Sequence, residues 1–386
     1  MKTYKAAISI ASNSPGIPTG YGVQALLLAE RLKRDGYDVA ALSNYGLQGQ
    51  VSTLETKHGK IKHYPTGLTL YSADAIPIHH ENFLAGRDIT NAVITLYDAW
   101  VFNDAPNLDH LKFLSWTPVD HISVPPKVLQ WAKKPNVYTI AMSPFGQAQF
   151  EKLGVESTYI PHAIDTALYR PQPAQKSAIG IPEDAFLVGM VSANKANGSI
   201  HRKAFAENML AFSLFRKENP NSYLYIHADP SKAFGGFDLG ILMKAVGLPK
   251  EAVIFPDPIK HRYGYTPQEM AVIYSTMDVL LHASYGEGFG VPAIEAQACG
   301  TRVIGSNWAA TPGILSEDSW LVDGQPFWDE AQSSFFMIPL IPSLIDALKQ
   351  AHELRGHSDI AVARAQDFDA DTVWRNYWQP FLKAQL

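Results

Sequence analysis

Short apolar runs that suit β-strands alternate with segments of helical periodicity along almost the whole chain. This alternation is typical of parallel sheets wound by helices, because consecutive parallel strands need a crossover between them. Strands are predicted at about Lys5–Ser12, Asp38–Asn44, Ala92–Tyr97, Leu111–Thr117, Val137–Met142, Thr158–Pro161, Leu187–Ser192, Ser222–His227, Ala252–Phe255, Asp278–Ala283 and Thr301–Gly305. Helices are predicted at about Tyr21–Asp35, Pro126–Lys133, Pro144–Leu153, Lys203–Lys217, Pro267–Ser275 and Val291–Cys299.

The length and composition of the chain bound the number of domains. Its 386 residues are enough for two domains with separate cores, and 46% hydrophobic and 18% charged residues describe an ordinary soluble globular protein. The stretch Asp165–Pro182 holds several prolines and glutamines with little apolar periodicity, which is typical of a linker. The sequence therefore predicts an α/β domain over residues 1–165, another over 166–368 and an aromatic-rich final segment over 369–386.

Charge and cysteine content indicate the kind of surroundings that the chain suits. The net charge of −5 gives no global attraction to nucleic acid or to an anionic membrane. Cys299 is the single cysteine, so an internal disulfide is excluded and a reducing compartment is favoured. The N-terminal apolar run is too short for a signal peptide, and no run reaches the roughly 18 residues of a membrane-spanning helix. We therefore expect a cytoplasmic protein without integral membrane association.

The stretch Ser284–Gly300 carries the most specific local pattern. The strand Asp278–Ala283 runs into a turn with three glycines at alternate positions, and a helix is expected to begin at about Val291. Glycines let a backbone approach a ligand closely, and the free amides of a helix start attract anions. The pattern therefore suits a phosphorylated, hydroxyl-rich ligand such as a nucleotide sugar. Because a carboxylate beside the diphosphate of such a ligand would repel it, Glu287 and Glu295 are better suited to accept hydrogen bonds from sugar hydroxyls. A structural turn with a glutamate as dipole partner is the alternative.

The run from Asp278 to about Gly313 resembles the donor-site signature of the family 4 retaining glycosyltransferases, which adopt the GT-B fold. The resemblance implies two Rossmann-like domains with parallel sheets that face across a cleft, and a C-terminal helix that crosses back to the first domain. It also implies that Glu287 meets the transferred sugar and that Glu295 holds the ribose diol. The amides expected to hold the sugar and the diphosphate are those of Gly288, Phe289 and Gly290.

Loops at the carboxyl ends of two other predicted strands carry further candidates. By resemblance, the glycine-rich loop Gly16–Gln24 borders the donor phosphates and the acceptor, with Gly20 as a candidate; a turn at a helix cap is the alternative. Family members place an Arg and a Lys in the segment Ser192–Lys203 to neutralise the departing diphosphate, for which both cations are suited. The candidates there are Arg202 and Lys203, with Lys195 in reserve. The family spacing is wider, so pairing of Lys195 with Lys203 stays open.

The first domain carries candidates after its predicted strands. Related enzymes have a histidine that touches the donor sugar in the region after the strand Leu111–Thr117. His121, oriented by Asp120, is therefore a candidate, and a structural role is the alternative. Polar or aromatic residues at strand ends are candidates for the acceptor side, with a core role equally open for the aromatic ones. They are Asp98, Trp100 and Trp116.

Two acidic positions bear on base and metal binding. Asp257 follows the strand Ala252–Phe255, where the family binds the nucleobase through the backbone. Three aspartates are spaced like metal ligands but precede the final helix, so helix capping is the better interpretation; they are Asp367, Asp369 and Asp371. By resemblance we expect no metal and no cofactor, with a nucleotide diphosphate sugar as co-substrate.

The resemblance implies transfer of a hexosyl or pentosyl group from a nucleotide diphosphate sugar to an acceptor hydroxyl, with retention at the anomeric carbon. Two alternatives stay open: a GT-B nucleotide-sugar epimerase that needs no acceptor, and a non-catalytic nucleotide-sugar-binding protein. A carbohydrate or small-molecule acceptor is expected. A modified DNA base ranks lower, because the first domain has balanced charge and no basic run. The sequence does not specify the base, the sugar or the oligomeric state.

Overall fold

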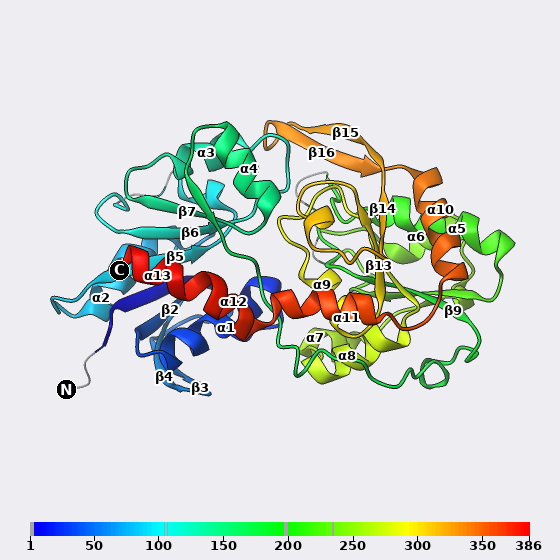
Figure 1. Cartoon of the computed structure of the whole chain (residues 1–386), viewed down its shortest axis with the longest axis horizontal. Coiled ribbons are helices and arrows are strands. Elements are labelled where there is room, and N and C mark those ends of the chain that lie inside the picture. Colours follow the sequence, from blue (N-terminus) through cyan, green and yellow to red (C-terminus); the bar gives the residue numbers. More distant parts are fainter. Residues whose placement is uncertain (1–3, 104, 106, 197–199, 234) are drawn as a thin grey trace. The chain divides into compact units, whose positions relative to one another are not determined.

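The chain divides into two compact units (Figure 1). The computed structural model describes residues 4–103, 105, 107–196, 200–233 and 235–386. The first unit comprises Met1–Ala163, Glu330–Ser334 and Ala370–Leu386, and the second comprises Ile164–Asp329 and Phe335–Asp369. The C-terminal segment therefore belongs to the same unit as the N-terminal sheet.

A largely parallel sheet forms the centre of the first unit. Within the described residues its order is β3-β4-β2-β1-β5-β6-β7-β8, and every neighbouring pair is parallel except β3 with β4. From β1 the chain first adds strands on one side of the sheet, and from β5 it adds them on the other side. The loops after β1 and β5 therefore lie at a topological switch point, where open α/β sheets bind ligands. The strands are β1 (Ala7–Asn13), β2 (Asp38–Tyr45), β3 (Ser52–Thr56), β4 (Gly59–Tyr64), β5 (Asn91–Leu96), β6 (Phe113–Thr117), β7 (Val137–Ala141) and β8 (Ser157–Tyr159).

Helices cover this sheet and complete the core of the first unit. Strands β1 and β5 are buried along almost their whole length, which explains their continuous apolar runs. The packed core includes Phe102, Phe113 and Trp131, whose rings contact one another. The helices of this unit are α1 (Gly20–Arg34), α2 (Ile76–Leu84), α3 (Pro126–Ala132), α4 (Pro144–Lys152), α12 (Ala370–Val373) and α13 (Gln379–Gln385).

The second unit is built around a parallel sheet of order β11-β10-β9-β12-β13-β14. Its switch point lies between β9 and β12, so the loops after these two strands are where this unit is expected to bind a ligand. The strands are β9 (Phe186–Val191), β10 (Ser222–His227), β11 (Val253–Ile254), β12 (Val279–His282), β13 (Arg302–Ser306) and β14 (Trp320–Val322), and β15 (Gly324–Asp329) forms a separate two-stranded sheet with β16 (Ser334–Pro339). The helices are α5 (Phe205–Glu218), α6 (Leu239–Ala245), α7 (Pro258–Tyr263), α8 (Pro267–Thr276), α9 (Val291–Ala298), α10 (Ile341–Glu353) and α11 (Asp359–Ala365).

The predicted α/β architecture with two parallel sheets is confirmed. Each predicted strand and helix is present, and its ends lie within two residues of those observed. The prediction was incomplete: it left out β3, β4, β14, the β15–β16 sheet and the helices α2, α6, α7, α10 and α11. Strand β3 alternates exposed and half-buried positions, so it has no apolar run that would mark it in the sequence.

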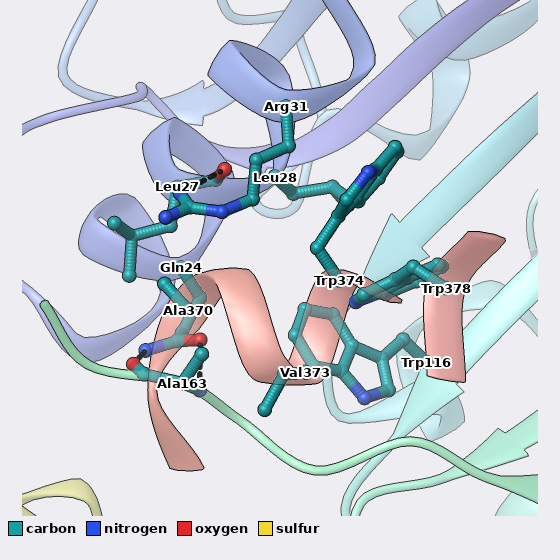
Figure 2. Close-up of a pocket in the computed structure, with 10 residues that line it drawn as sticks. All are labelled: Gln24, Leu27, Leu28, Arg31, Trp116, Ala163, Ala370, Val373, Trp374 and Trp378. Atoms are coloured by element: carbon teal, nitrogen blue, oxygen red, sulfur yellow. Dashed lines mark hydrogen bonds between the residues drawn. The ribbon is translucent and has the colours of Figure 1, made fainter. Parts of the chain in front are cut away.

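The aromatic C-terminal segment packs on α1 and β6 within the first unit (Figure 2). The ring of Trp378 meets that of Trp116 at 5.0 Å, edge to face, and Trp374 Nε1 donates a hydrogen bond to Asp35 at 2.9 Å. Figure 2 shows the pocket that these tryptophans line, and the Gln24 side chain on its edge exchanges two hydrogen bonds with the main chain of Ala163. The side-chain amide of Gln24 is therefore already paired within the first unit.

None of the helices in the described part of the chain is both long enough and apolar enough to cross a membrane.

Candidate active site

Of the three glycines in the turn between β12 and α9, Gly290 has a positive φ. Gly290 precedes the first residue of α9 with φ +105°, and a Cβ there would lie 3.2 Å from both the His282 ring and Ile314. A side chain at this position would therefore be strained and crowded. Gly300 follows the helix with φ +83°, as expected for a C-terminal cap. The turn thus ends at a helix start whose free amides suit an anion.

Glu287 lies in this turn and is the centre of a buried ion-pair cluster. Its Oε1 accepts a hydrogen bond from Lys203 Nζ at 2.5 Å, and its Oε2 lies 3.4 Å from Arg202 Nη1. Arg202 also donates to the main-chain carbonyl of Gly286 at 2.8 Å. Burial alone would raise the pKa of Glu287, but the charges of Lys203 and Arg202 outweigh it and hold the pKa well below its usual range. Glu287 is therefore ionised throughout the physiological range.

The two cations come from the loop after β9, which is the other side of the switch point in this unit. The sequence predicted Arg202 and Lys203 as neighbours of a diphosphate, and the structure brings both to Glu287 in the turn after β12. The reserve candidate Lys195 is exposed and forms a backbone bridge with Gly235. Residues 197–199 of this loop lie outside the described part of the chain. The arrangement favours the pair Arg202 and Lys203 over Lys195.

Asn194 organises the same loop, and the sequence did not single it out as a site residue. Its side chain donates to the main-chain carbonyls of Asp229 at 3.0 Å and Phe237 at 2.8 Å, and it accepts from the Phe237 amide at 3.0 Å. The Phe237 ring in turn stacks on His201 at 3.6 Å between centroids. The residue immediately before Arg202 is therefore held by a network that starts at the end of β9.

Glu295 lies on α9 and faces α8. The buried hydroxyl of Tyr274 donates to its Oε2 at 2.8 Å. Burial raises the pKa of Glu295 to about 7, although hydrogen bonds from Tyr274 and Tyr169 work against this increase. Glu287 and Glu295 thus differ in charge state near neutral pH, because the cations around Glu287 outweigh its burial, whereas the hydrogen bonds to Glu295 do not.

The glycine-rich loop after β1 forms the start of α1. Thr19 caps the helix, and its Oγ1 accepts from the Gly22 amide at 3.1 Å. A Cβ on Gly22 would lie 2.7 Å from Ile17, so the fold requires glycine there. A Cβ on the candidate Gly20 would meet no atom within 4 Å. The glycine at position 20 therefore has no packing explanation, which leaves its proposed role beside a ligand open.

The structure brings His121 and Asp120 together as the sequence suggested. His121 is buried, and its Nδ1 lies 2.6 Å from Asp120 Oδ1. Asp98 is exposed at the start of a short 3₁₀ turn after β5, and the half-buried Trp100 ring meets that of Tyr71 edge to face at 5.3 Å. Asp98 and Trp100 therefore lie at the switch point of the first unit.

Trp116 lies in the interior of the first unit. Its side chain is 2% exposed, and its Nε1 donates to the main-chain carbonyl of Ile160 at 2.8 Å. The ring lies among His162 and Trp378 in the interior of the first unit. This burial and these contacts favour the alternative core role for Trp116.

The acidic candidates have local partners. Asp257 is exposed and caps α7, accepting from the Lys260 amide at 2.8 Å. The three aspartates near the C-terminus have separate partners, which are Arg364 for Asp367, Thr166 for Asp369, and Arg31 with Arg34 for Asp371. Among the described residues, no group of three or more His, Cys, Asp or Glu side chains has an arrangement that could hold a metal ion.

Comparison with known proteins adds the family context. Residues 243–332 match the family model described as glycosyl transferases group 1. The D-inositol 3-phosphate glycosyltransferase of Arthrobacter sp. (strain FB24) is 28% identical over 179 residues, which are 44% of this chain and 39% of that protein. The corresponding protein of Acidothermus cellulolyticus is 28% identical over 231 residues, or 55% of this chain and 45% of that protein. This chain thus matches less than half the length of these two relatives.

Solved structures are similar along almost the whole chain. Sucrose-phosphate synthase from Thermosynechococcus elongatus superposes with a TM-score of 0.69 at 17% identity, covering 98% of this chain and 99% of that one. Anabaena HepE in complex with UDP-glucose gives a TM-score of 0.65 at 17% identity, covering 98% and 100%. The fold is therefore GT-B. Together with the matched segment, this confirms the resemblance to the family 4-like glycosyltransferases.

Proposed function

We propose that this chain is a glycosyltransferase that moves a sugar from a nucleoside diphosphate sugar to an acceptor hydroxyl with retention of anomeric configuration. The observation that carries the proposal is the cluster of Glu287, Lys203 and Arg202 beside the turn that begins α9. It combines a carboxylate for sugar hydroxyls, two cations for a diphosphate and a helix start that attracts anions. The HepE structures with UDP and UDP-glucose make UDP-sugars the first donors to test.

The proposed mechanism needs no protein nucleophile. The acceptor hydroxyl attacks on the face from which the diphosphate departs, and the departing phosphate oxygen takes the acceptor proton. Lys203 and Arg202 stabilise the negative charge that grows on the diphosphate, which is the electrostatic contribution expected of preorganised charged groups. Glu287 holds the sugar, Glu295 the ribose, and the amides of residues 288–290 the sugar and diphosphate.

We propose residues 1–165, 166–368 and 369–386 as acceptor domain, donor domain and C-terminal helix. In the first of these, His121 oriented by Asp120 would contact the transferred sugar and Gly20 the donor phosphates. Asp98 and Trp100 would contact the acceptor, and Asp257 in the second domain would lie near the base. A cytoplasmic location without a metal or other cofactor is part of the same proposal. The acceptor is a carbohydrate or small molecule in preference to nucleic acid, because the chain carries a net charge of −5.

Incubation with UDP-glucose and other nucleotide sugars, with and without candidate acceptors, tests the proposal. Release of nucleoside diphosphate that depends on an acceptor, with a glycosylated product by mass spectrometry, is the expected result. An epimerised donor without an acceptor would instead indicate an epimerase. Tight donor binding with neither product would indicate a binding protein.

Stereochemistry gives a separate prediction. An α-linked donor is expected to yield an α-linked product, because attack and departure on one face leave the anomeric configuration unchanged. Proton NMR of the first-formed product measures this through the anomeric signal. A β-linked first product would exclude the proposed mechanism while leaving transferase activity itself intact.

The pKa of Glu295 leads to a prediction about pH. If the ribose hydroxyls bind ionised Glu295, binding must release a proton from the protonated form, so affinity for nucleoside diphosphate should increase as pH rises through about 7. Calorimetric titration with UDP at pH 6, 7 and 8 measures this increase. Glu295→Gln is the control, because it retains the titration of the nucleotide phosphate and removes that of the carboxyl. The same pH dependence in both proteins would remove Glu295 from the ribose site.

Glu295→Ala is expected to weaken UDP binding by about 1–3 kcal/mol, as for loss of a hydrogen bond to a charged group.

A further inference from the structure

His282, the last residue of β12, lies directly beneath the turn that carries Glu287. Its side chain is only 2% exposed, and its Nε2 lies 3.7 Å from Glu287 Oε1. This nitrogen is completely buried and has no hydrogen-bond partner among the described residues. Buried polar atoms without partners are rare in folded proteins and call for an explanation.

The two oxygens of Glu287 have different neighbours. Arg202 Nη1 lies 3.4 Å from Oε2. Lys203 Nζ and His282 Nε2 both lie near Oε1, at 2.5 and 3.7 Å. Lys203 now occupies the hydrogen-bonding position at Oε1, and His282 is less than about 1 Å beyond hydrogen-bond distance. Oε1 of Glu287 therefore has Lys203 as its hydrogen-bond partner and His282 as a further nearby donor.

A diphosphate bound beside Lys203 would compete with Glu287 for its ammonium group. Lys203 has a flexible four-carbon side chain that is 18% exposed, whereas the Glu287 side chain is 7% exposed. An incoming phosphate therefore reaches the ammonium more easily than the carboxylate and draws it outward. Leaving Oε1 buried without a donor would cost the desolvation free energy of a charged group, which opposes this movement.

We propose that His282 is a positioning residue that donates a hydrogen bond from Nε2 to Glu287 Oε1 when Lys203 turns to the diphosphate. This inference rests on the proposed function, because it requires a diphosphate at Lys203. The charged groups facing His282 are Glu287, Lys203 and Arg202. Burial and the two cations lower the pKa of His282 to about 4, although Glu287 opposes this shift. The ring is therefore neutral at physiological pH. A neutral ring protonated on Nε2 can make the proposed bond, and the carboxylate stays fixed against the sugar.

The test compares His282→Leu with His282→Gln. Leucine fills similar space without a polar atom, whereas glutamine keeps an N–H donor near the position of Nε2. Calorimetric titration with UDP is expected to show affinity about tenfold or more lower for His282→Leu and within about threefold of the unchanged protein for His282→Gln. His352→Leu is the matched control: this histidine packs against Phe186 at 5.0 Å, away from the turn, and its loss should leave UDP affinity unchanged.

A Lys203→Met background separates positioning from simple structural support. Glu287 then lacks the lysine both before and after UDP binds, so His282→Leu should cause no further loss of affinity. Equal losses in both backgrounds would show a merely structural role and overturn the proposal. No loss from His282→Leu in the unchanged protein would also overturn it, because Lys203 would then hold carboxylate and phosphate together.

A measurement on the unchanged protein covers the case in which His282→Leu does not fold. Addition of UDP to histidine-labelled protein should produce a downfield, slowly exchanging imidazole N–H proton signal that is missing from His282→Gln. Absence of this signal in the UDP complex would contradict the proposed bond. If UDP, GDP and ADP all fail to bind the unchanged protein, the proposed function fails and the inference falls with it.

Discussion

Replacing Lys203 with alanine is expected to lower turnover by about a hundredfold or more, the range for losing one preorganised charge-stabilising group. The diphosphate gains negative charge as the glycosidic bond breaks, so a cation beside it binds the transition state more strongly than the ground state. Donor affinity should therefore fall less than turnover. Steady-state kinetics with a UDP-sugar, combined with calorimetric titration of UDP, measures the two effects separately.

Controls for this prediction come from the same loop. Arg202→Ala should also lower turnover, because its guanidinium lies at the same carboxylate. Lys195→Ala, at an exposed position, should have little effect. If Lys203→Ala and Arg202→Ala keep near-normal turnover and Lys195→Ala does not, the phosphate cation has been misassigned. EDTA should not abolish activity; loss in EDTA with recovery on adding a divalent metal would contradict the metal-free mechanism.

Glu287→Gln is expected to lower turnover by about a hundredfold, as for a misplaced reacting group, while UDP affinity stays the same or increases. The carboxylate is proposed to hold the sugar and not the nucleotide, and its neutralisation frees Lys203 from a 2.5 Å ion pair, leaving it available to the diphosphate. The same two measurements, turnover and UDP titration, decide the outcome. A large loss of UDP affinity in this variant, equal to that of Glu295→Ala, would contradict the division of roles between the two glutamates.

Stability must be followed in the same variant. Glu287 is buried and Lys203 and Arg202 are its partners, and removing one member of a buried ion pair leaves uncompensated charge that is costly. Thermal unfolding of Glu287→Gln should therefore begin at a lower temperature than that of the unchanged protein. Kinetics are to be compared at a temperature where both proteins are folded, so that lost turnover reports on the chemistry.

Local patterns predicted the sheets and the glycine-rich turn between β12 and α9. Strand β10 was located to the residue, and α1 and α9 to within one residue, because apolar periodicity, proline in a first turn and glycine after a last turn depend only on neighbours in the chain. Gly290 and Gly300, on either side of α9, both have a positive φ. Motifs that are contiguous in sequence, including the two glutamates, could therefore be found without a structure.

Only the tertiary structure decided which side chains meet. Lys203 and Glu287 are 84 residues apart and come together because β9 and β12 are neighbours in the sheet, a register that no local pattern specifies. The same holds for Trp116, which looked like a strand-end aromatic and is buried because the C-terminal Trp378 packs against it. His282 reads in the sequence as one polar residue in an apolar strand. Its role depends on a buried carboxylate, and burial is a property of the folded chain alone.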